Sequence, residues 1–277
     1  MTIRHYVKRI LGLSLAALTI LGAAACSQPP KQDITQVAEK LQEAESFHYD
    51  MTMAMEMTIA GQPLSIATVA SADQTMHPLA MKLNITTDMG EIGNSEKKMY
   101  MEETDGTFYV YTAVDQGDSV VWQRTEMKKE EVLKQYDAQG ELELYLSSAE
   151  RFTEAGKDTV NGIQTTRYHG VIVGEDIAAV LEASGTLDGL GSLGVNEDII
   201  ASMWDTIGDL PVSIWVSDDN YPVQYRMDMT EIMQALTAGM TDQLGISFGI
   251  GQTEISMTFS KFNEIEPIVM PESVPNS

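Results

Sequence analysis

The sequence predicts an α+β fold built on a large, curled antiparallel β-sheet of about ten strands, with a few helices. Two observations predict it. Long stretches alternate between apolar and polar residues, which is the pattern of strands with one solvated face. Turn-forming residues separate these stretches, and helical stretches interrupt them without the regular strand–helix alternation of a parallel sheet.

The N-terminal 25 residues have the layout of a secretion signal. An apolar run, Ile10–Ala25, is too short and too rich in small residues at its end to span a membrane. It follows three cationic residues, Arg4, Lys8 and Arg9. We therefore expect residues 1–25 to be a signal peptide, absent from the folded domain.

Cys26 is the only cysteine of the chain, so an internal disulfide and a CxxC site are excluded. It follows Gly22-Ala23-Ala24-Ala25, and small residues directly before a lone Cys resemble a bacterial lipobox. The resemblance implies cleavage between Ala25 and Cys26 and diacylation of Cys26, although Ala23 stands where a lipobox usually has Leu. The alternative is an ordinary secretion signal. Residues 26–32 would then be a polar tether after the anchor.

The chain is strongly acidic, with 17 Lys and Arg against 41 Asp and Glu. This charge argues against a nucleic-acid partner. Residues 1–25 contain three cations and no acids, so their removal changes the formal charge from −24 to −27. Such a domain is repelled by an anionic bilayer, and we expect it to stand off the extracytoplasmic face of the cell membrane on its lipid anchor.

The domain, predicted over residues 33–272 with a tail at 273–277, begins with a helix over residues 33–45. A long strand follows from Phe47 to Ile59, and its roughly 40 Å length suggests that the sheet curls. Further strands are predicted around residues 79–85, 99–101, 108–111, 120–122, 165–173, 212–216, 223–229 and 255–259. Asp105-Gly106 predicts a turn before residue 108, and Asn161-Gly162 predicts a hairpin that leads into the strand at 165–173. Helices are predicted at 126–149, 174–184, 196–208 and 230–238, and Gly-rich apolar segments that could close over a cavity at 185–194 and 239–251.

Three local patterns resemble the LolA/LppX-like lipoprotein-carrier superfamily, and more narrowly Gram-positive lipoproteins with that fold. They are Thr159-Val160-Asn161-Gly162 leading into Thr165–Tyr168, the stretch Leu210–Val216 before an Asp-rich turn, and the ending Phe262–Pro271. The resemblance covers residues 33–272. It implies a half-barrel closed on its concave side by helices, with an apolar cavity for acyl chains.

Catalytic motifs fail on their context. Gly245–Gly249 matches G-x-S-x-G, but the last histidine, His169, lies upstream. Ser95–Lys98 matches S-x-x-K in a predicted turn, without its companion elements. Gly189–Gly194 matches G-x-G-x-x-G after a helix-like stretch instead of a strand. We therefore expect no enzyme and no cofactor.

Metal sites of the usual kinds are not predicted either. Asp218-Asp219-Asn220 lacks the alternating oxygen spacing of a calcium loop and indicates a hairpin turn. The histidines His48, His77 and His169 have no metal-ligand spacing.

Methionines recur on single strand faces, and three interpretations remain open. They can be ordinary core, because Met is an adaptable filler. They can line a cavity for a flexible apolar ligand, because Met-rich walls repack easily. They can bind Cu(I) through Met53 and Met55, because thioethers are soft ligands. The residues predicted to line a ligand cavity are Tyr49, Met51, Met53, Met55, Met57, Met81, Leu83, Met99, Met101, Met227, Met229 and Met257.

The sequence therefore leads to a lipid-anchored extracytoplasmic lipoprotein that binds or carries a lipid or another amphiphile. The alternative is a lipoprotein with a fully packed core that binds other proteins at the cell surface. Cu(I) binding is a third possibility.

Overall fold

The computed structural model describes residues 35–115, 120–128, 152–173, 209–244 and 247–272, together with Val132, Leu142, Leu146, Ile177, Val274 and Pro275. Residues 34–277 form one compact unit, distinct from residues 1–33. The N-terminal signal, the lipobox and most of the residues predicted as helices at 126–149, 174–184 and 196–208 lie outside the described residues.

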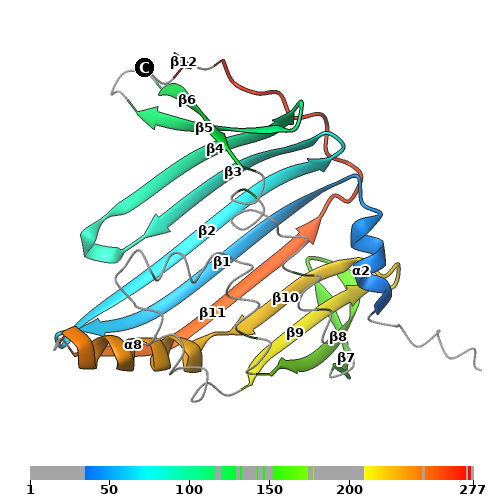
Figure 1. Cartoon of the computed structure of the whole chain (residues 1–277). Helices are drawn as coiled ribbons and strands as arrows, with labels where there is room; N and C mark the ends of the chain where they lie inside the picture. Colours follow the sequence, from blue (N-terminus) through cyan, green and yellow to red (C-terminus); the bar gives the residue numbers. More distant parts are fainter. Residues whose placement is uncertain are drawn as a thin grey trace, which may run out of the picture. The chain divides into compact units, whose positions relative to one another are not determined.

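One twelve-stranded sheet makes up most of the described structure (Figure 1). Its strands, in chain order, are β1 (Ser46–Ile59), β2 (Gln62–Met76), β3 (Leu79–Asp88), β4 (Asn94–Thr104), β5 (Thr107–Asp115), β6 (Val120–Met127), β7 (Thr153–Val160), β8 (Ile163–Ile172), β9 (Leu210–Ser217), β10 (Pro222–Asp228), β11 (Phe248–Ser260) and β12 (Val274–Pro275). The helices are α2 (Thr35–Gln42) and α8 (Thr230–Leu244), with a short 3₁₀ turn η2 (Gly90–Ile92).

The sheet consists of two antiparallel meanders joined in the middle. The strand order is β12-β6-β5-β4-β3-β2-β1-β11-β10-β9-β8-β7. Strands β1 to β6 follow one another in sequence, as do β7 to β11, and the two series meet where β1 pairs with β11. Every pairing is antiparallel except that of the two-residue β12, which adds in parallel to β6. The predicted antiparallel sheet is confirmed, and it is open, with β12 and β7 at its edges.

Tight turns keep consecutive strands in register. Asn161 and Gly162 between β7 and β8 both have positive φ, 50° and 82°, as do Asp105 and Gly106 between β4 and β5. Two consecutive positive φ values are typical of the type I′ turn, whose twist matches that of a hairpin. Gly without a Cβ and Asn or Asp tolerate this conformation, so these dipeptides predicted both hairpins correctly.

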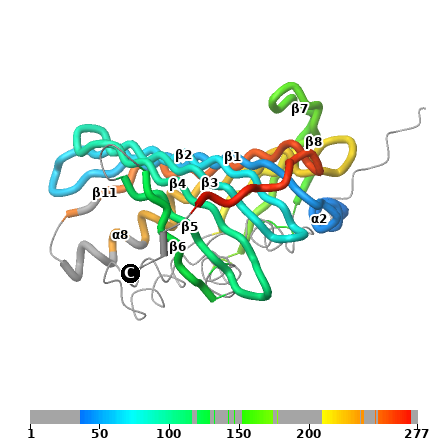
Figure 2. The backbone as a smooth tube through the Cα atoms, turned by 90° about the horizontal axis from the view of Figure 1, so that it is seen from above, coloured from blue at the N-terminus to red at the C-terminus, as the bar shows by residue number. Residues whose placement is uncertain are grey.

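The core lies on one face of the sheet. Phe47 and Tyr49 of β1, Phe108 of β5 and Phe259 of β11 belong to a single buried cluster. The cluster also contains Val37 and Leu41 of α2 and Ile232 of α8, and the buried helical residues Val132, Leu142, Leu146 and Ile177. Seen from above, β5 and β6 turn away from the plane of β1–β4 toward the side on which α8 lies (Figure 2). The sheet is therefore curled as the length of β1 suggested.

One expectation from the sequence needs correction at the C-terminal end of the fold. The Gly-rich segment 239–251 is not a loop, because α8 continues to Leu244 and β11 begins at Phe248. Met, Gln and Leu are good helix formers and outweigh the single Gly239 within the helix. Gly251 lies where the register of β1 and β11 shifts, and a Cβ there would lie 3.1 Å from the Glu56 Cβ. This glycine therefore marks a bulge inside a strand.

The sequence also missed two strands, β2 and the two-residue β12 in the predicted tail, and misplaced one helix start. β2 went unpredicted because its inward residues include Thr68, Ala70 and Ala72, which give a weak apolar alternation. The helix expected from residue 126 starts later, since β6 extends to Met127. Within the residues that the structure describes, no helix is long and apolar enough to cross a membrane.

Candidate functional site

The residues predicted to line a cavity share one face of the sheet. Tyr49 of β1 pairs with Ala72 of β2 and Phe259 of β11, and Ala72 pairs in turn with Leu83 of β3. Directly opposite residues in neighbouring strands point to the same side, so the register carries this face from strand to strand. The same reasoning places the predicted methionines of β1, β3, β4, β10 and β11 on this face. Met229, just after β10, joins the same buried cluster.

Part of this face is a packed core. Of the twelve predicted residues, eight are buried: Tyr49, Met81, Leu83, Met99, Met101, Met227, Met229 and Met257. The Tyr49 hydroxyl donates to the Met81 Sδ at 3.5 Å, so the polar atom of the tyrosine has a partner inside the cluster. For these positions the structure supports the core interpretation of the methionines.

The other part of the face is only partly covered. Along β1, the inward residues are buried at Phe47 and Tyr49 but half-buried from Met51 to Ile59. The inward residues of β2 and β3 also change from buried to half-buried. On β2 the change comes after Ala70, and on β3 it comes at Ile85, which pairs with Ala70. We call the half-buried apolar residues beyond this line the apolar patch: Met53, Met55, Met57, Ile59, Leu64, Ile66 and Ile85.

The apolar patch is continuous across β1 and β2, and Ile85 adds a member on β3. Met55 pairs with Ile66 and Met57 pairs with Leu64, so the two strands present four apolar side chains together. Thr68 and Thr87 interrupt the patch, but their hydroxyls hydrogen-bond to each other at 3.2 Å. Sequence reasoning found the methionines and missed Leu64 and Ile66, although both continue a period of two that is visible in the sequence.

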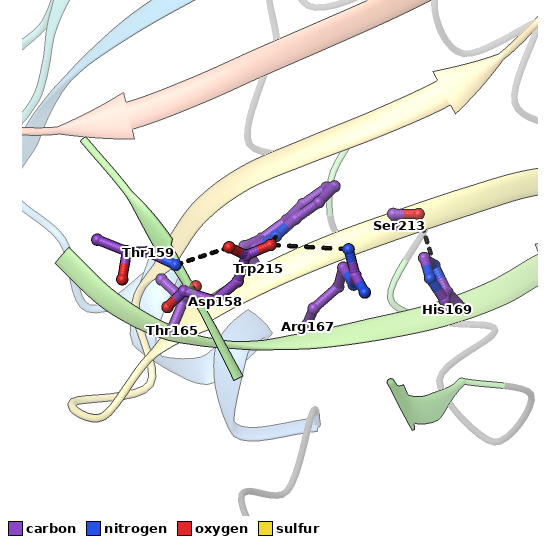
Figure 3. A network of polar contacts seen from close by, with 7 residues as sticks. All are labelled: Asp158, Thr159, Thr165, Arg167, His169, Ser213 and Trp215. Atoms are coloured by element: carbon purple, nitrogen blue, oxygen red, sulfur yellow. Dashed lines mark hydrogen bonds and ion pairs between the residues drawn. The ribbon is translucent and has the colours of Figure 1, made fainter. Parts of the chain in front are cut away.

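Polar groups gather on the opposite face, at the β7–β9 end (Figure 3). The Trp215 Nε1 donates to the Asp158 Oδ2 at 3.1 Å, and the Arg167 Nη1 lies 3.6 Å from the same oxygen. The hydrogen bond from Trp215 lowers the pKa of the Asp158 carboxyl, and the backbone N–H of Thr159 and the charge of Arg167 act in the same direction. This network satisfies the polar groups around the buried Trp215 ring and holds that ring against β7. Its polar contacts are therefore explained by the stability of the fold.

His169 and Ser213 also lie in this region, with 2.7 Å between the His169 Nδ1 and the Ser213 Oγ (Figure 3). A serine nucleophile needs a base that a third group orients. Among the described residues no carboxylate oxygen lies within 4.0 Å of a His169 ring nitrogen. We therefore interpret the contact between His169 and Ser213 as a cross-strand hydrogen bond between β8 and β9.

Two of the three catalytic motifs of the sequence lie in the wrong structural context. Ser95 and Lys98 both belong to β4, not to the predicted turn, and three residues apart on a strand they point to opposite faces. Gly249 lies in β11, which follows helix α8. A nucleophile elbow requires the reverse order, a strand followed by a helix. Gly189–Gly194 lies outside the described residues.

Metal ligands of the usual kind do not assemble in the described part of the chain, where no three or more His, Cys, Asp or Glu side chains could hold one ion. The turn at Asp218-Asp219-Asn220 joins β9 to β10 as a hairpin, as predicted, with Asn220 at φ 64°. His48 lies between two carboxylates, with its Nδ1 2.7 Å from the Asp73 Oδ1 and its Nε2 3.2 Å from the Asp50 Oδ2.

Comparison with known proteins gives a family match over part of the chain. Residues 31–165 match a family described as a family of unknown function, DUF6612. No curated protein matches the sequence.

Among solved structures, the chain is similar to LprF from Mycobacterium bovis, with 16% identity, a TM-score of 0.48, and coverage of 86% of this chain and 94% of that one. It is also similar to the Mycobacterium tuberculosis lipoprotein LppX, with 16% identity, a TM-score of 0.43, and coverage of 86% and 96%. A putative outer membrane lipoprotein-sorting protein domain from Vibrio parahaemolyticus matches at 8% identity with a TM-score of 0.25, over 82% of this chain and 88% of that one.

Proposed function

We propose that this protein is a lipid-anchored extracytoplasmic lipoprotein that binds a lipid or another amphiphile against the apolar patch. The observation that carries the proposal is the change in burial along β1, where one apolar row passes from a packed core at Phe47 and Tyr49 to a half-buried stretch from Met51 to Ile59. Apolar surface that continues out of a core without being fully covered is typical of binding surfaces.

The chemistry of the patch favours a flexible apolar ligand. Methionine has an unbranched, adaptable side chain that repacks around variable shapes. From Met53 to Ile59 the strand extends over roughly 20 Å, long enough to contact much of an extended acyl chain. Each CH₂ group removed from water contributes about 0.8 kcal/mol, so a chain lying along the patch binds through many small contributions.

Helices would cover the ligand on the inner side of the curled sheet. The buried helical residues Val132, Leu142, Leu146 and Ile177 belong to the same cluster as the inward side chains of β1 and support this arrangement. The proposed cavity then lies between these helices and the apolar patch, with Met51 at the boundary to the packed core of Tyr49 and the buried methionines.

The signal-like N-terminus supports the anchor. Diacylated Cys26 would hold the domain at the membrane through residues 26–32, close to a source of lipids. We infer a binding protein instead of an enzyme because two of the three catalytic motifs of the sequence lie in unsuitable contexts.

Native mass spectrometry tests the proposal. The chain from Ser27 onward, which contains every described element, is recovered from its own host and then incubated with host lipid extract. The double variant Met53→Gln with Met55→Gln makes the patch polar. We expect it to lose roughly 2 kcal/mol of binding, a decrease in affinity of about 30-fold. The matched control, Ala54→Gln, places the same side chain at an exposed position on the other face of β1 and should bind normally.

The outcomes separate the three interpretations of the methionines. Wild-type protein that carries no lipid and takes up none would refute the proposal. Such a result together with a co-purified protein lost in the double variant would favour the protein-interaction alternative. Uptake of Cu(I) by the wild type, abolished in the double variant but retained in the control, would favour a thioether metal site.

A further inference from the structure

A row of polar and aromatic side chains crosses the face of the sheet opposite the apolar patch. Its members follow one another in direct register across six strands: His48, Asp73, Lys82, Tyr100, Tyr111 and Arg124. Neighbours in such a row are close enough to contact one another and one shared ligand. This face takes no part in the proposed lipid site.

The C-terminal segment after β11 runs past β1–β4 on its way to β6 (Figure 1). Its residues 264–269 share a pocket lining with Asp73, Lys82 and Tyr100 of the row. Its start is fixed by the backbone N–H of Asn263, which donates to the Ser46 carbonyl at 2.7 Å, and by the N–H of Ile265, which donates to the Ser46 Oγ at 3.2 Å. Its far end adds to β6 as β12, where Val274 pairs with Gln123. The segment is thus held at both ends.

A pocket of 420 Å³ lies between this segment and the row. Asp73, Lys82 and Tyr100 line it from β2, β3 and β4, and Lys261 with residues 264–269 lines it from the segment. Its volume lies within the range of roughly 300–1,000 Å³ that is usual for small-molecule sites.

The pocket contains two lysines without a carboxylate partner among the described residues, a property that they share with Lys97 and Arg124. Five other cationic side chains, Lys40, Lys98, Lys157, Arg167 and Arg226, each have a carboxylate oxygen within 4.0 Å. Within the described residues, no such partner lies near Lys82 or Lys261. Two such lysines in one pocket leave two positive charges available to an anionic group of a ligand.

The pocket also presents negative charge. Asp73, Glu264 and Glu266 line it beside the two lysines. A simple anion would meet three carboxylates, and a simple cation would meet two ammonium groups. A molecule that carries both charges can pair its anionic group with the lysines and its cationic group with the carboxylates. The Tyr100 ring and Ile268 can contact a short apolar part between its two charged groups.

We propose that this pocket binds a small zwitterion, a molecule that carries an ammonium group together with a carboxylate or phosphate group. Lys82 and Lys261 bind the anionic group, and Asp73 with Glu264 binds the ammonium group. Two sources supply this chemistry, a free molecule such as a short peptide and the headgroup of a zwitterionic phospholipid.

Calorimetric titration of the chain from Ser27 onward tests the proposal with four probes. The dipeptide alanylalanine and phosphoethanolamine carry both charges, whereas acetate and ethylammonium carry one each. We expect at least one zwitterion to bind one to one, more weakly as salt is raised, and both single ions to bind at least tenfold more weakly. Preference for the dipeptide indicates a free ligand, and preference for phosphoethanolamine indicates a headgroup.

Charge-neutral variants locate the site. Lys82→Gln and Lys261→Gln should each weaken zwitterion binding about tenfold or more, because each removes a charge-assisted contact. The matched control is Lys97→Gln, which removes the same charge from an exposed position on the other face, since Lys97 pairs with Ile85. The inference is overturned if neither zwitterion binds, if a single ion binds as well, or if the variants bind like the control. None of these results affects the apolar patch on the opposite face.

Discussion

Two methionines on the same face of the sheet should differ sharply in their contribution to stability. Met81 is 1% exposed, and its sulfur accepts a hydrogen bond from the Tyr49 hydroxyl. Met55 belongs to the apolar patch and is half-buried. Truncation of a buried Met to Ala costs about 2–5 kcal/mol, because the lost transfer energy adds to the cost of the cavity. At Met55 much of the side chain already contacts solvent, so the cost should stay at about 1 kcal/mol.

Thermal and urea unfolding of ligand-free protein, followed by circular dichroism, measure this difference. For a domain of this size 1 kcal/mol changes Tm by about 2–4 °C. We therefore expect Met81→Ala to lower Tm by roughly 4–20 °C and Met55→Ala by about 4 °C or less, so that the loss is larger at Met81. Equal losses, or a larger loss at Met55, would show that the burial boundary along β1 is wrong, and with it the basis of the proposed lipid site.

Three further predictions concern other parts of the chain. Cys26→Ser should release the protein from membranes, measured by cell fractionation, whereas an unchanged membrane fraction would contradict lipidation. Gly170→Ala places a Cβ 2.5 Å from the Phe152 Cδ1 and should lower the free energy of unfolding by roughly 1–3 kcal/mol; an unchanged urea midpoint would refute that packing. Because the folded-state pKa of Asp158 is lowered, its stabilisation is present above its ordinary value of 3.8 and is lost as pH falls through the lower folded-state pKa. The wild type should therefore exceed Asp158→Asn in Tm at pH 7, and the gap should narrow at pH 3, whereas a constant gap would exclude the charge as the cause.

Local signals explain why much of the sheet could be predicted. The alternation from Phe47 to Ile59 predicts β1, since side chains along a strand point to opposite faces in turn. Asn161-Gly162 and Asp105-Gly106 predict their hairpins because each dipeptide tolerates two consecutive positive φ values. Both signals arise from residues a few positions apart, so they are visible without a tertiary structure.

Weak local signals explain the errors. The small inward residues Ala70 and Ala72 give β2 only a weak apolar alternation, so the sequence does not reveal this strand. Packing against Tyr49 and Leu83 of the neighbouring strands stabilises β2, and that packing is not visible in the sequence. The glycines of segment 239–251 suggested a loop. One of them, Gly251, instead permits the close approach of β11 to Glu56.

The sequence by itself determined the membrane-anchor prediction, the acidic charge and the apolar face of β1, because each depends on composition or on neighbouring residues. Only the tertiary structure decided which part of that face is packed, since burial of Met81 and half-burial of Met55 depend on strands and helices far away in the chain. The same holds for the pocket on the other face. Lys82 and Lys261 are separated by most of the chain, and they meet because β11 returns beside β1 and leads the C-terminal segment across to β6.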